Sequence, residues 1–492
     1  MRIVDSLTAL VFATFLLAPA MSLLGFGYDQ DAENTVNLAD IDLAKLIETD
    51  RTYRDDIVDR ALLNSPVGMH AIRTKNWFDY RVFGFIKTDQ VISGEDNWLF
   101  YLPGFENGKC TEPRRIRWAI DKTEAFSHIA AASGTNFLFS VSPDKSTVAE
   151  SSLGPRATIA AGCKLGNARA WRQYAKASGA GLLDHFEALQ HSTAEMSIYY
   201  RTDTHWNELG GSLALRQIAS IWLDKDIGHP QPGSGTLLPV DTDLRTGMLR
   251  LPIQETTESY PDYWENAFPK EVGNGVRGSV IVHDSFYKRI IGPLKTLFPD
   301  GQFFDLNHPD PDSMRQAIAA RPAYLLVNSV ERRLIPRLVS QNYSWNSPLG
   351  MGLIDANEDA ARTCQYRSVE LADVQFAKME PSTNPNQFTT LKDPKLYVRL
   401  LGGTMQPCIR IRFSTSSLSV SQLFLPVDAD GNIREGMSVK FFDKIEPVRL
   451  IELVLPTQYA GTTIRFDPDI GESTIDDLYI EVGQTSTGIH SN

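Results

Sequence analysis

Short apolar segments alternate with longer amphipathic stretches through the middle of this chain. The apolar segments predict buried strands, and the stretches between them have the apolar spacing of helices. The predicted strands are 136–142, 181–183, 279–282 and 323–327, and the predicted helices are 115–132, 167–178, 211–224, 286–297 and 311–320. Strands interleaved with helices of this length predict an α/β fold, in which helices cover both faces of a largely parallel sheet.

Two parts of this region depart from the alternation. The dipeptide Gly154-Pro155 predicts a loop. The segment 228–275 is rich in Pro, Gly and acidic residues and has no strong periodicity, so we expect a long irregular insertion. Insertions of that length are often lids or binding surfaces.

After residue 360 the pattern changes to short segments of alternating polarity separated by turn residues. The segments are 396–401, 409–414, 418–425, 439–442, 449–455, 462–466 and 478–482. Short strands at this spacing predict an antiparallel β-sandwich. We therefore expect an α/β domain over 29–360, a β-sandwich domain over 361–484 and a disordered tail over 485–492.

The N-terminus has the pattern of a targeting segment. Residues 7–26 are nearly all apolar and carry no charge, after a start that contains Arg2 and Asp5. A run of about 20 apolar residues can span a bilayer, whereas a cleaved signal has a core of about 7–15. Because Ala18-Pro19-Ala20 resembles a cleavage site, residues 1–28 are either a signal anchor, which we favour, or a signal peptide. Both predict export.

Charge and cysteine content agree with an exported protein. The net charge of -12 argues against general nucleic-acid binding but leaves room for a local basic site. An even number of cysteines in an exported chain predicts disulfides, with free buried thiols as the alternative. Pairing by proximity gives Cys110–Cys163 and Cys364–Cys408. The cysteine spacing matches no zinc site, so we expect no metal and no cofactor.

Three residues have the chemistry of a nucleophilic hydroxyl site. Asp203 and His205 are two positions apart in a loop, so they project to the same side. Ser285 follows a buried strand and precedes a predicted helix, the edge of an open α/β sheet where ligands bind. A serine hydroxyl attacks an acyl carbon only when an imidazole takes its proton and a carboxylate orients that imidazole. The first amides of the following helix would help to stabilise an oxyanion.

Two other polar clusters have simpler interpretations. Asp184 and His185 form a rival Asp–His pair at a strand end, and such a pair is more often structural. The acidic segment 308–312 has metal-ligand chemistry, yet a turn followed by a helix cap explains it more simply.

Five ordered segments within residues 80–340 resemble the periplasmic alginate O-acetyltransferases of the AlgX and AlgJ type. Two of them, 202–206 and 284–286, contain the three residues of the nucleophilic hydroxyl site described above. The other three are Gly-Glu-Asp-Asn-Trp-Leu-Phe-Tyr at 94–101, Ser-Pro-Asp-Lys-Ser-Thr-Val at 142–148, and Leu-Val-Asn-Ser-Val-Glu-Arg-Arg-Leu at 326–334. The resemblance implies an SGNH-hydrolase-like three-layer catalytic domain over 29–360.

By that resemblance, Ser285 is the nucleophile, His205 the general base and Asp203 the carboxylate that orients it. The chain departs from the family pattern two residues before the serine, where His283 replaces the usual glycine. An imidazole there would crowd the turn or add a second titrating group. Lys145, in the segment 142–148, is either a site residue or a structural one.

The family resemblance predicts acetyl transfer to an exported, alginate-like exopolysaccharide through an acetyl-serine. An acetyl-esterase with the same triad and a catalytically silent glycan-binding scaffold are the alternatives. An exported enzyme has no cytosolic acetyl carrier, so we expect a membrane O-acyltransferase to relay acetyl groups. We also expect other polysaccharide-secretion proteins as partners and a periplasmic location, possibly with an inner-membrane tether.

Four residues are candidates for binding an anionic or neutral polysaccharide. Lys288 and Arg332 have the charge to pair with sugar carboxylates, and Trp206 and Tyr287 have rings on which a pyranose could stack. The alternatives are that Arg332 caps a helix and Trp206 fills the core.

The resemblance also implies that the C-terminal domain is carbohydrate-binding-like, with a purely structural cap as the alternative. Its candidate aromatic platform consists of Phe441, Phe442 and Tyr459.

Overall fold

A computed structural model of the protein describes residues 66–106, 110–178, 182–193, 197–251, 254–339, 346–382, 384, 386–415, 420–426, 432–442, 448–468 and 474–486. The predicted targeting segment 1–28 lies outside these residues, and so does the predicted disordered tail 485–492 except for its first two residues. The prediction of disorder is wrong for Thr485, which ends the last strand. Within the described ranges, no helix is long and apolar enough to cross a membrane.

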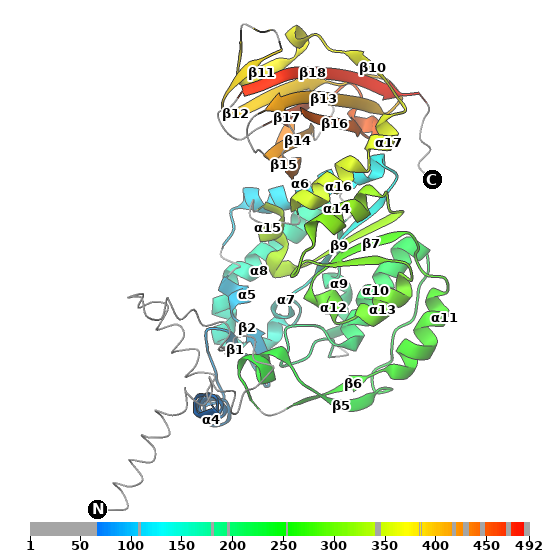
Figure 1. Ribbon diagram of the computed structural model, residues 1–492. Helices are drawn as coiled ribbons and strands as arrows, with labels where there is room; N and C mark the ends of the chain where they lie inside the picture. Colours follow the sequence, from blue (N-terminus) through cyan, green and yellow to red (C-terminus); the bar gives the residue numbers. More distant parts are fainter. Residues whose placement is uncertain are drawn as a thin grey trace, which may run out of the picture.

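The first half is built on a five-stranded parallel sheet with the order β4-β3-β9-β7-β8 (Figure 1). Its strands are β3 (Asn136–Ser142), β4 (Leu182–Asp184), β7 (Ser279–His283), β8 (Gln302–Asp305) and β9 (Tyr324–Val330). The four predicted strands are confirmed. Strand β8 was not predicted, because its four residues are too few to establish a period.

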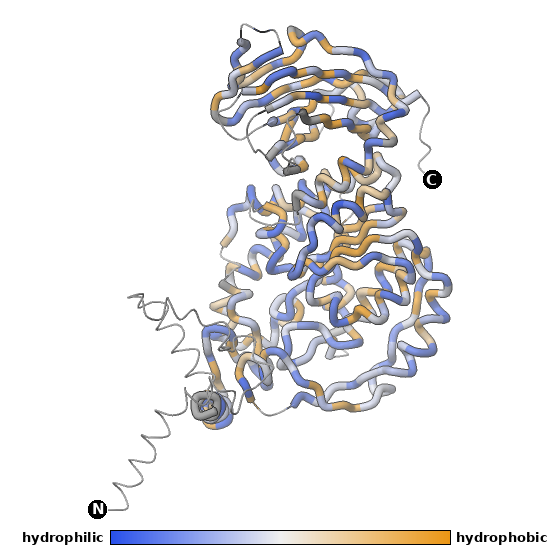
Figure 2. Tube along the Cα trace, viewed as in Figure 1, coloured by the Kyte–Doolittle hydropathy of each residue, from blue (hydrophilic) through white to orange (hydrophobic). Residues whose placement is uncertain are grey.

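Helices cover both faces of this sheet, as predicted. Alternate strand residues enter two separate cores: Val280 and Val282 pack on one side, and Ile281 packs on the other. One side carries α6 (Pro113–Ala132), α8 (Gly154–Ala177), α14 (Pro311–Ala319), α15 (Glu331–Val339) and α16 (Asn346–Asp355). The other carries α10 (Glu208–Leu223), α11 (Phe268–Val272), α12 (Ser285–Lys288) and α13 (Ile291–Leu297). The strands form the apolar centre of this domain (Figure 2).

Two local predictions were wrong. The Gly154-Pro155 dipeptide begins α8 instead of forming a loop, because Gly154 adopts a φ of +68° and proline is well suited to the first helical turn. The predicted helix 286–297 is broken into α12 and α13. That break leaves Ser285 at the start of a very short helix.

The insertion 228–275 is more ordered than predicted. Strands β5 (Thr236–Val240) and β6 (Glu255–Ser259) form an antiparallel hairpin, and π-helical turns cover Asp243–Met248 and Tyr263–Ala267. Most hairpin side chains are exposed or only partly buried, so this pair of strands carries no apolar alternation that a sequence pattern could reveal.

Further helices and strands complete the first half of the protein. They are α4 (Pro66–Val82), β1 (Val91–Ser93), β2 (Leu99–Tyr101), α5 (Pro103–Glu106), α7 (Lys145–Val148), α9 (Phe186–Thr193) and α17 (Glu358–Ala361).

The second half is an antiparallel β domain. Its strands are β10 (Cys364–Ser368), β11 (Gln375–Pro381), β12 (Phe388–Arg399), β13 (Pro407–Thr415), β14 (Val420–Pro426), β15 (Ile433–Phe442), β16 (Val448–Val454), β17 (Thr463–Asp467) and β18 (Thr474–Thr485). The antiparallel prediction is confirmed. Hydrogen bonds join these nine strands into one continuous curled sheet (Figure 1).

The two halves share a buried interface between α6, α16 and β15. Lys122 is buried there and donates a hydrogen bond from Nζ to Ser438 Oγ at 3.0 Å. Beside it, Asp121 pairs with Arg434 at 2.9 Å. Burial lowers the pKa of Lys122 to about 7 and raises that of Asp121 to about 6. Charged groups therefore face each other across this interface.

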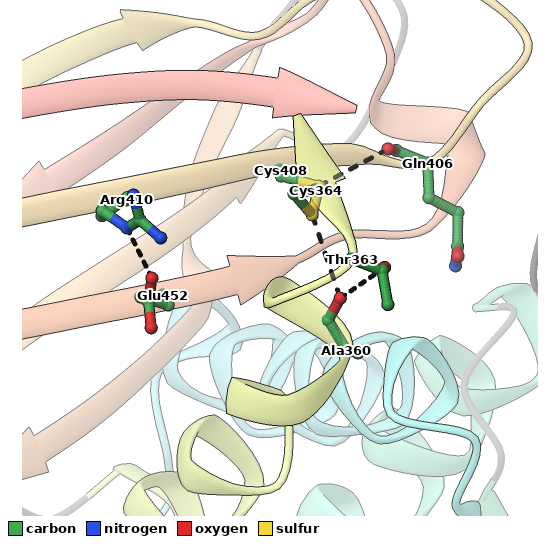
Figure 3. Close-up of a disulfide and its surroundings, with 7 residues drawn as sticks. All are labelled: Ala360, Thr363, Cys364, Gln406, Cys408, Arg410 and Glu452. Carbon is green, nitrogen blue, oxygen red and sulfur yellow. Dashed lines mark hydrogen bonds and ion pairs between the residues drawn. A yellow bond between two sulfur atoms is a disulfide. The ribbon is translucent and has the colours of Figure 1, made fainter. Parts of the chain in front are cut away.

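Both predicted disulfides are present, and the described residues include no free cysteine. Cys110–Cys163 ties the segment before α6 to α8. Cys364–Cys408 ties β10 to β13, beside the end of α17 (Figure 3). The second bridge fixes the point at which the chain passes into the C-terminal sheet.

Candidate active site

Ser285 lies on the turn where β7 ends and α12 begins. The preceding residue, Asp284, caps this helix, because its Oδ1 accepts a hydrogen bond from the N–H of Phe286 at 3.0 Å. The other oxygen of Asp284 accepts hydrogen bonds from the N–H of Val330 and, at 3.2 Å, from Nη1 of Arg337. Asp284 therefore ties the turn to the end of β9 and holds Ser285, half-buried, at the carboxyl edge of the sheet.

Asp203 and His205 lie in the loop that precedes α10, and neighbouring side chains hold this loop by its backbone. The buried Nζ of Lys145 donates hydrogen bonds to the carbonyl oxygens of Arg201 and Asp203, at 3.0 and 2.5 Å. Glu255, at the start of β6, accepts a hydrogen bond from the N–H of Arg201 at 2.8 Å. Burial lowers the pKa of Lys145 to about 8, although nearby carboxylates favour its charged form.

The predicted carboxylate and imidazole are in contact. Oδ1 of Asp203 accepts hydrogen bonds from Nδ1 and from the backbone N–H of His205, at 2.7 and 2.9 Å. Its Oδ2 accepts hydrogen bonds from Nη2 of Arg289 at 2.9 Å and from the N–H of Asp243 at 3.0 Å. Burial opposes ionisation of Asp203, but these hydrogen bonds and the charges of His205 and Arg289 hold its pKa well below its usual range. The carboxylate is therefore ionised at neutral pH.

The other nitrogen of His205 is free. Nε2 is buried, and no described residue, Ser285 included, makes a hydrogen bond to it. The His205 ring packs on that of Phe286, with 4.9 Å between the centroids, and Phe286 is the residue after Ser285. The structure thus places the three predicted residues at one end of the sheet.

Asp243 is a site residue that the sequence analysis missed. It comes from the insertion, and its two oxygens accept hydrogen bonds from the N–H of Thr204, at 2.8 Å, and from its hydroxyl. Its Oδ2 also lies 3.6 Å from Nδ1 of His205. Burial and the charge of Asp203 raise the pKa of Asp243. No motif marks this residue, since it lies far along the chain in a segment without periodicity.

The same cluster has the chemistry of a cation site. Asp203, His205 and Asp243 each bring one potential ligand atom within 4.8 Å of the others. In the structure, Nδ1 of His205 is hydrogen-bonded to Asp203 at 2.7 Å and lies 3.0 Å from the hydroxyl of Thr204. A cation bound to Nδ1 would replace the hydrogen bond that orients the imidazole, so metal binding and triad chemistry exclude each other here.

Two of the predicted sugar-binding residues are not accessible. Trp206 is 1% exposed and Tyr287 is 0% exposed, and both belong to the core beneath the sheet. The hydroxyl of Tyr287 is hydrogen-bonded to Ser140 Oγ at 2.6 Å and to Nε2 of His185 at 2.9 Å. This corrects the prediction that the two rings stack on a pyranose, because core packing already uses both faces of each ring.

The two predicted cationic residues differ in their surroundings. Lys288 is exposed and lies 3.4 Å from Asp305. Arg332 is largely buried and donates a hydrogen bond from Nη1 to Asp144 at 2.5 Å, with Lys164 pairing with the same carboxylate at 2.8 Å. Both residues therefore have a carboxylate partner, but only Lys288 is exposed enough to meet a ligand at the surface.

The rival Asp–His pair does not form. Asp184 pairs with Arg172 at 2.8 Å, away from the neighbouring imidazole. His185 is buried with both ring nitrogens engaged, Nδ1 by Gln217 at 2.6 Å and Nε2 by the hydroxyls of Ser140 and Tyr287, each at 2.9 Å. Burial lowers the pKa of His185 to about 4. His185 is therefore a neutral structural residue, in line with the simpler interpretation.

The other sequence candidates are also structural. His283 is buried, and its Nδ1 lies 3.1 Å from the carbonyl oxygen of Asp284. Asp310 accepts a hydrogen bond from the N–H of Ser313 at 3.2 Å, so the acidic segment is the expected helix cap. Tyr459 is buried against His128 and offers no platform to a sugar.

The C-terminal sheet has two exposed apolar residues that were not predicted. Phe441 and Phe442 end strand β15. Tyr479, which is half exposed, and Leu450 lie on strands on either side of β13, where both pair with Arg412. The sequence pattern missed this surface because a single tyrosine in an alternating strand carries no signal.

Comparison with known proteins agrees with this architecture. The sequence family "SGNH hydrolase-like domain, acetyltransferase AlgX" matches residues 91–259. No match is found among curated protein sequences.

Among solved structures, the chain is similar to the O-acetyltransferase domain of Pseudomonas putida AlgJ, with 16% identity, 50% of this chain and 92% of that chain covered, and a TM-score of 0.34. It is also similar to Pseudomonas aeruginosa AlgX, with 12% identity, 80% and 94% coverage, and a TM-score of 0.37. A third similar structure is Bacillus cereus PatB1 with a sulfonyl adduct, with 15% identity, 51% and 96% coverage, and a TM-score of 0.36. Residues 91–259 of this chain are thus similar in sequence to the SGNH hydrolase-like domain of the acetyltransferase AlgX.

Proposed function

We propose that this protein is an O-acetyltransferase that acetylates hydroxyl groups of an exported polysaccharide through an acetyl-Ser285 intermediate. The observation that carries the proposal is the state of His205. One ring nitrogen is bound to an ionised carboxylate and the other is free, on the side chain that packs against the serine turn. The acetyltransferase AlgX, whose family the chain matches, supports the same chemistry.

In the first half of the reaction, Ser285 Oγ attacks the acetyl carbonyl of the donor while Nε2 of His205 takes the hydroxyl proton. The bond from the acetyl carbon to the donor breaks, and the donor's leaving group receives that proton from His205. Asp203 stabilises the imidazolium that forms between these steps. The backbone N–H of Ser285 is the oxyanion donor that we propose, because Asp284 already occupies the N–H of Phe286.

In the second half, a sugar hydroxyl loses its proton to Nε2 of His205 and attacks the acetyl-serine. The ester bond to Ser285 breaks, and the serine oxygen takes the proton back. Water competes for the same intermediate, and if it wins the protein is an acetyl-esterase. Transfer therefore requires a sugar that is held in position beside the serine.

The proposal includes an exported location. The predicted N-terminal targeting segment and the two disulfides support a periplasmic protein, tethered to the inner membrane if that segment is an uncleaved anchor. An acetyl group would then reach Ser285 from a membrane O-acyltransferase, with other polysaccharide-secretion proteins nearby. The C-terminal sheet would hold the polymer close to the catalytic domain.

The experiment incubates the full chain with an activated acetyl ester and an oligosaccharide acceptor, and follows acetylated sugar by mass spectrometry. Acetylated sugar is expected from the natural protein and none from Ser285→Ala, because no other group can form the acyl intermediate. Ser313→Ala, which changes a serine at the start of α14, is the matched control and should leave the product unchanged.

The alternatives predict different outcomes. Release of acetate without acetylated sugar would make the protein an esterase. If Ser285→Ala is as active as the natural protein, and a serine-reactive probe does not label the natural protein, the catalytically silent glycan-binding scaffold is the remaining alternative. Loss of activity after treatment with a chelator, restored by a divalent cation, would instead assign the Asp203–His205–Asp243 cluster to a metal.

A further inference from the structure

A cavity of about 600 Å³ lies between α4, the β5–β6 hairpin and the segment that leads into the catalytic loop. Arg201 and Thr202 form part of its wall, and the next residue in the chain is Asp203. Its volume is within the range of about 300–1,000 Å³ that is usual for small-molecule sites. The proposed mechanism uses none of the side chains that line this cavity.

The cavity collects three arginines in a protein whose net charge is -12. Arg81, Arg201 and Arg245 all line it, and none of them forms an ion pair with a carboxylate of the described residues. Nε of Arg245 is buried and makes no hydrogen bond to a described residue. The guanidinium of Arg245 lies 5.8 Å from the ring centroid of Tyr80. These arginines are therefore available to an anion.

The acidic residues in the same wall already have partners. Glu255 accepts hydrogen bonds from the backbone N–H groups of Arg201 and Thr202, at 2.8 and 2.9 Å, and from the hydroxyl of Thr202 at 2.6 Å. Glu258 accepts hydrogen bonds from the N–H of Gly233, at 3.0 Å, and from the hydroxyl of Tyr260. Neutral donors hold both carboxylates, so the arginines are not needed to neutralise them by direct contact.

We propose that this cavity is a second carbohydrate site, which binds a carboxylate-bearing saccharide through Arg201 and Arg245, with Arg81 at its rim. A guanidinium matches a carboxylate with two parallel hydrogen bonds. The rest of the lining is rich in amides and hydroxyls, including those of Asn97, Ser197 and Thr257, which suits the hydroxyl groups of a sugar. The inference rests on the proposed polysaccharide acetyltransferase and adds a place outside the serine site where its polymer is held.

The position of the site links binding to the catalytic loop. Glu255 belongs to the cavity wall and also holds the backbone on the N-terminal side of Asp203. A saccharide bound to Arg201 therefore contacts the same chain segment that presents Asp203 and His205. Polymer bound in the cavity would restrain this loop while a neighbouring stretch of polymer is acetylated.

Binding can be measured without turnover in the full chain carrying Ser285→Ala. Calorimetric titration with an oligouronate is expected to give saturable binding that weakens with salt, whereas a neutral oligosaccharide of the same length should bind at least tenfold more weakly. Adding Arg201→Ala or Arg245→Ala should weaken oligouronate binding by roughly ten- to a hundredfold, the effect of losing a charge-assisted hydrogen bond. Arg277→Ala changes an exposed arginine outside the cavity and should have no effect.

Three outcomes would overturn the inference. They are equal binding of the neutral oligosaccharide, preferential binding of a sulfated oligosaccharide over the uronate, and unchanged affinity in both arginine variants at a wild-type melting temperature. Its failure is separate from failure of the proposed function. Acetyl transfer without uronate binding contradicts only the cavity assignment, and uronate binding without acetyl transfer contradicts only the acetyltransferase.

Discussion

Two buried histidines in the catalytic domain, each next to an aspartate in sequence or one residue removed, have opposite surroundings. His185 lies in the core with partners on both ring nitrogens, and its neighbour Asp184 pairs with Arg172 instead. His205 lies at the edge of the sheet with Nδ1 bound to Asp203 and Nε2 free. The sequence motifs are nearly the same, but only one imidazole retains a lone pair for chemistry.

The comparison shows how one fold gives a structural histidine and the proposed catalytic one different surroundings. A buried imidazole whose hydrogen bonds are all made contributes to stability. Protonating it costs free energy, because the charged form is buried away from water. A buried imidazole with one free nitrogen has lost that contribution, and burial of an unsatisfied polar atom costs about 1–3 kcal/mol. Such a cost is retained at sites where the free atom has a function.

The largest expected effect comes from changing the free imidazole. His205→Gln should lower acetyl transfer from an activated ester by about 10³-fold or more, because the side chain can no longer accept the serine proton. The melting temperature should change little. The measurement is the initial rate of acetyl transfer, and a rate within tenfold of the natural protein would break the distinction between the two histidines.

The matched change, His185→Gln, should act on stability instead. Gln cannot make all the hydrogen bonds to Gln217, Ser140 and Tyr287, so the free energy of unfolding should fall by about 1–3 kcal/mol. Acetyl transfer below the melting transition should stay within several-fold of the natural rate. Chemical denaturation and rate measurements on the same preparation test both statements, and a catalytic collapse with a normal unfolding curve would contradict them.

The pH dependence of stability sharpens the comparison further. Burial lowers the pKa of His185 from 6.5 to about 4, so between these values the unfolded chain binds the extra proton. Stability from this group is therefore complete above pH 6.5 and is lost as the pH falls toward 4, by on the order of 3 kcal/mol. Unfolding curves measured between pH 4 and 6.5 should show this loss in the natural protein. In His185→Gln the free energy of unfolding should depend less on pH.

Changing Asp243 to Asn should have the smallest effect. It should raise the free energy of unfolding, whereas His185→Gln lowers it. Its pKa is raised by burial and by Asp203, so the folded state holds this proton more tightly than the unfolded chain does. The stability contributed by the protonated form is lost as the pH rises through the folded pKa. Asp243→Asn imitates that form and should raise the free energy of unfolding at neutral pH, by less than the loss expected for His185→Gln.

The gain in Asp243→Asn should vanish in acid, where the natural carboxyl is also protonated. Acetyl transfer should fall several-fold, because Thr204 and the loop that carries His205 lose a charged acceptor. Thermal melts at neutral and acidic pH, together with rates, test the assignment. A variant that is less stable at neutral pH would show that the carboxylate form is required for folding.

Much of the fold was predictable because its elements have strong periodicity. Strand β3 was predicted with its observed bounds, and α6 begins only slightly before the predicted helix 115–132. The predicted helix 167–178 is the second half of α8, which already begins at Gly154. The exceptions have local causes. Strand β9 continues beyond the prediction through Asn328 and Ser329, polar residues that are buried because they hydrogen-bond within the core.

Sequence alone determined the parallel sheet, the change to antiparallel strands, both cysteine pairs and the identity of the three candidate catalytic residues. These follow from local periods, from the order of elements and from the chemistry of particular side chains. Only the tertiary structure decided which rings are buried, which histidine keeps a free nitrogen, and that Asp243 and Glu255 reach the catalytic loop. Those properties depend on contacts between segments far apart in the chain, and such contacts leave no period that a linear pattern can reveal.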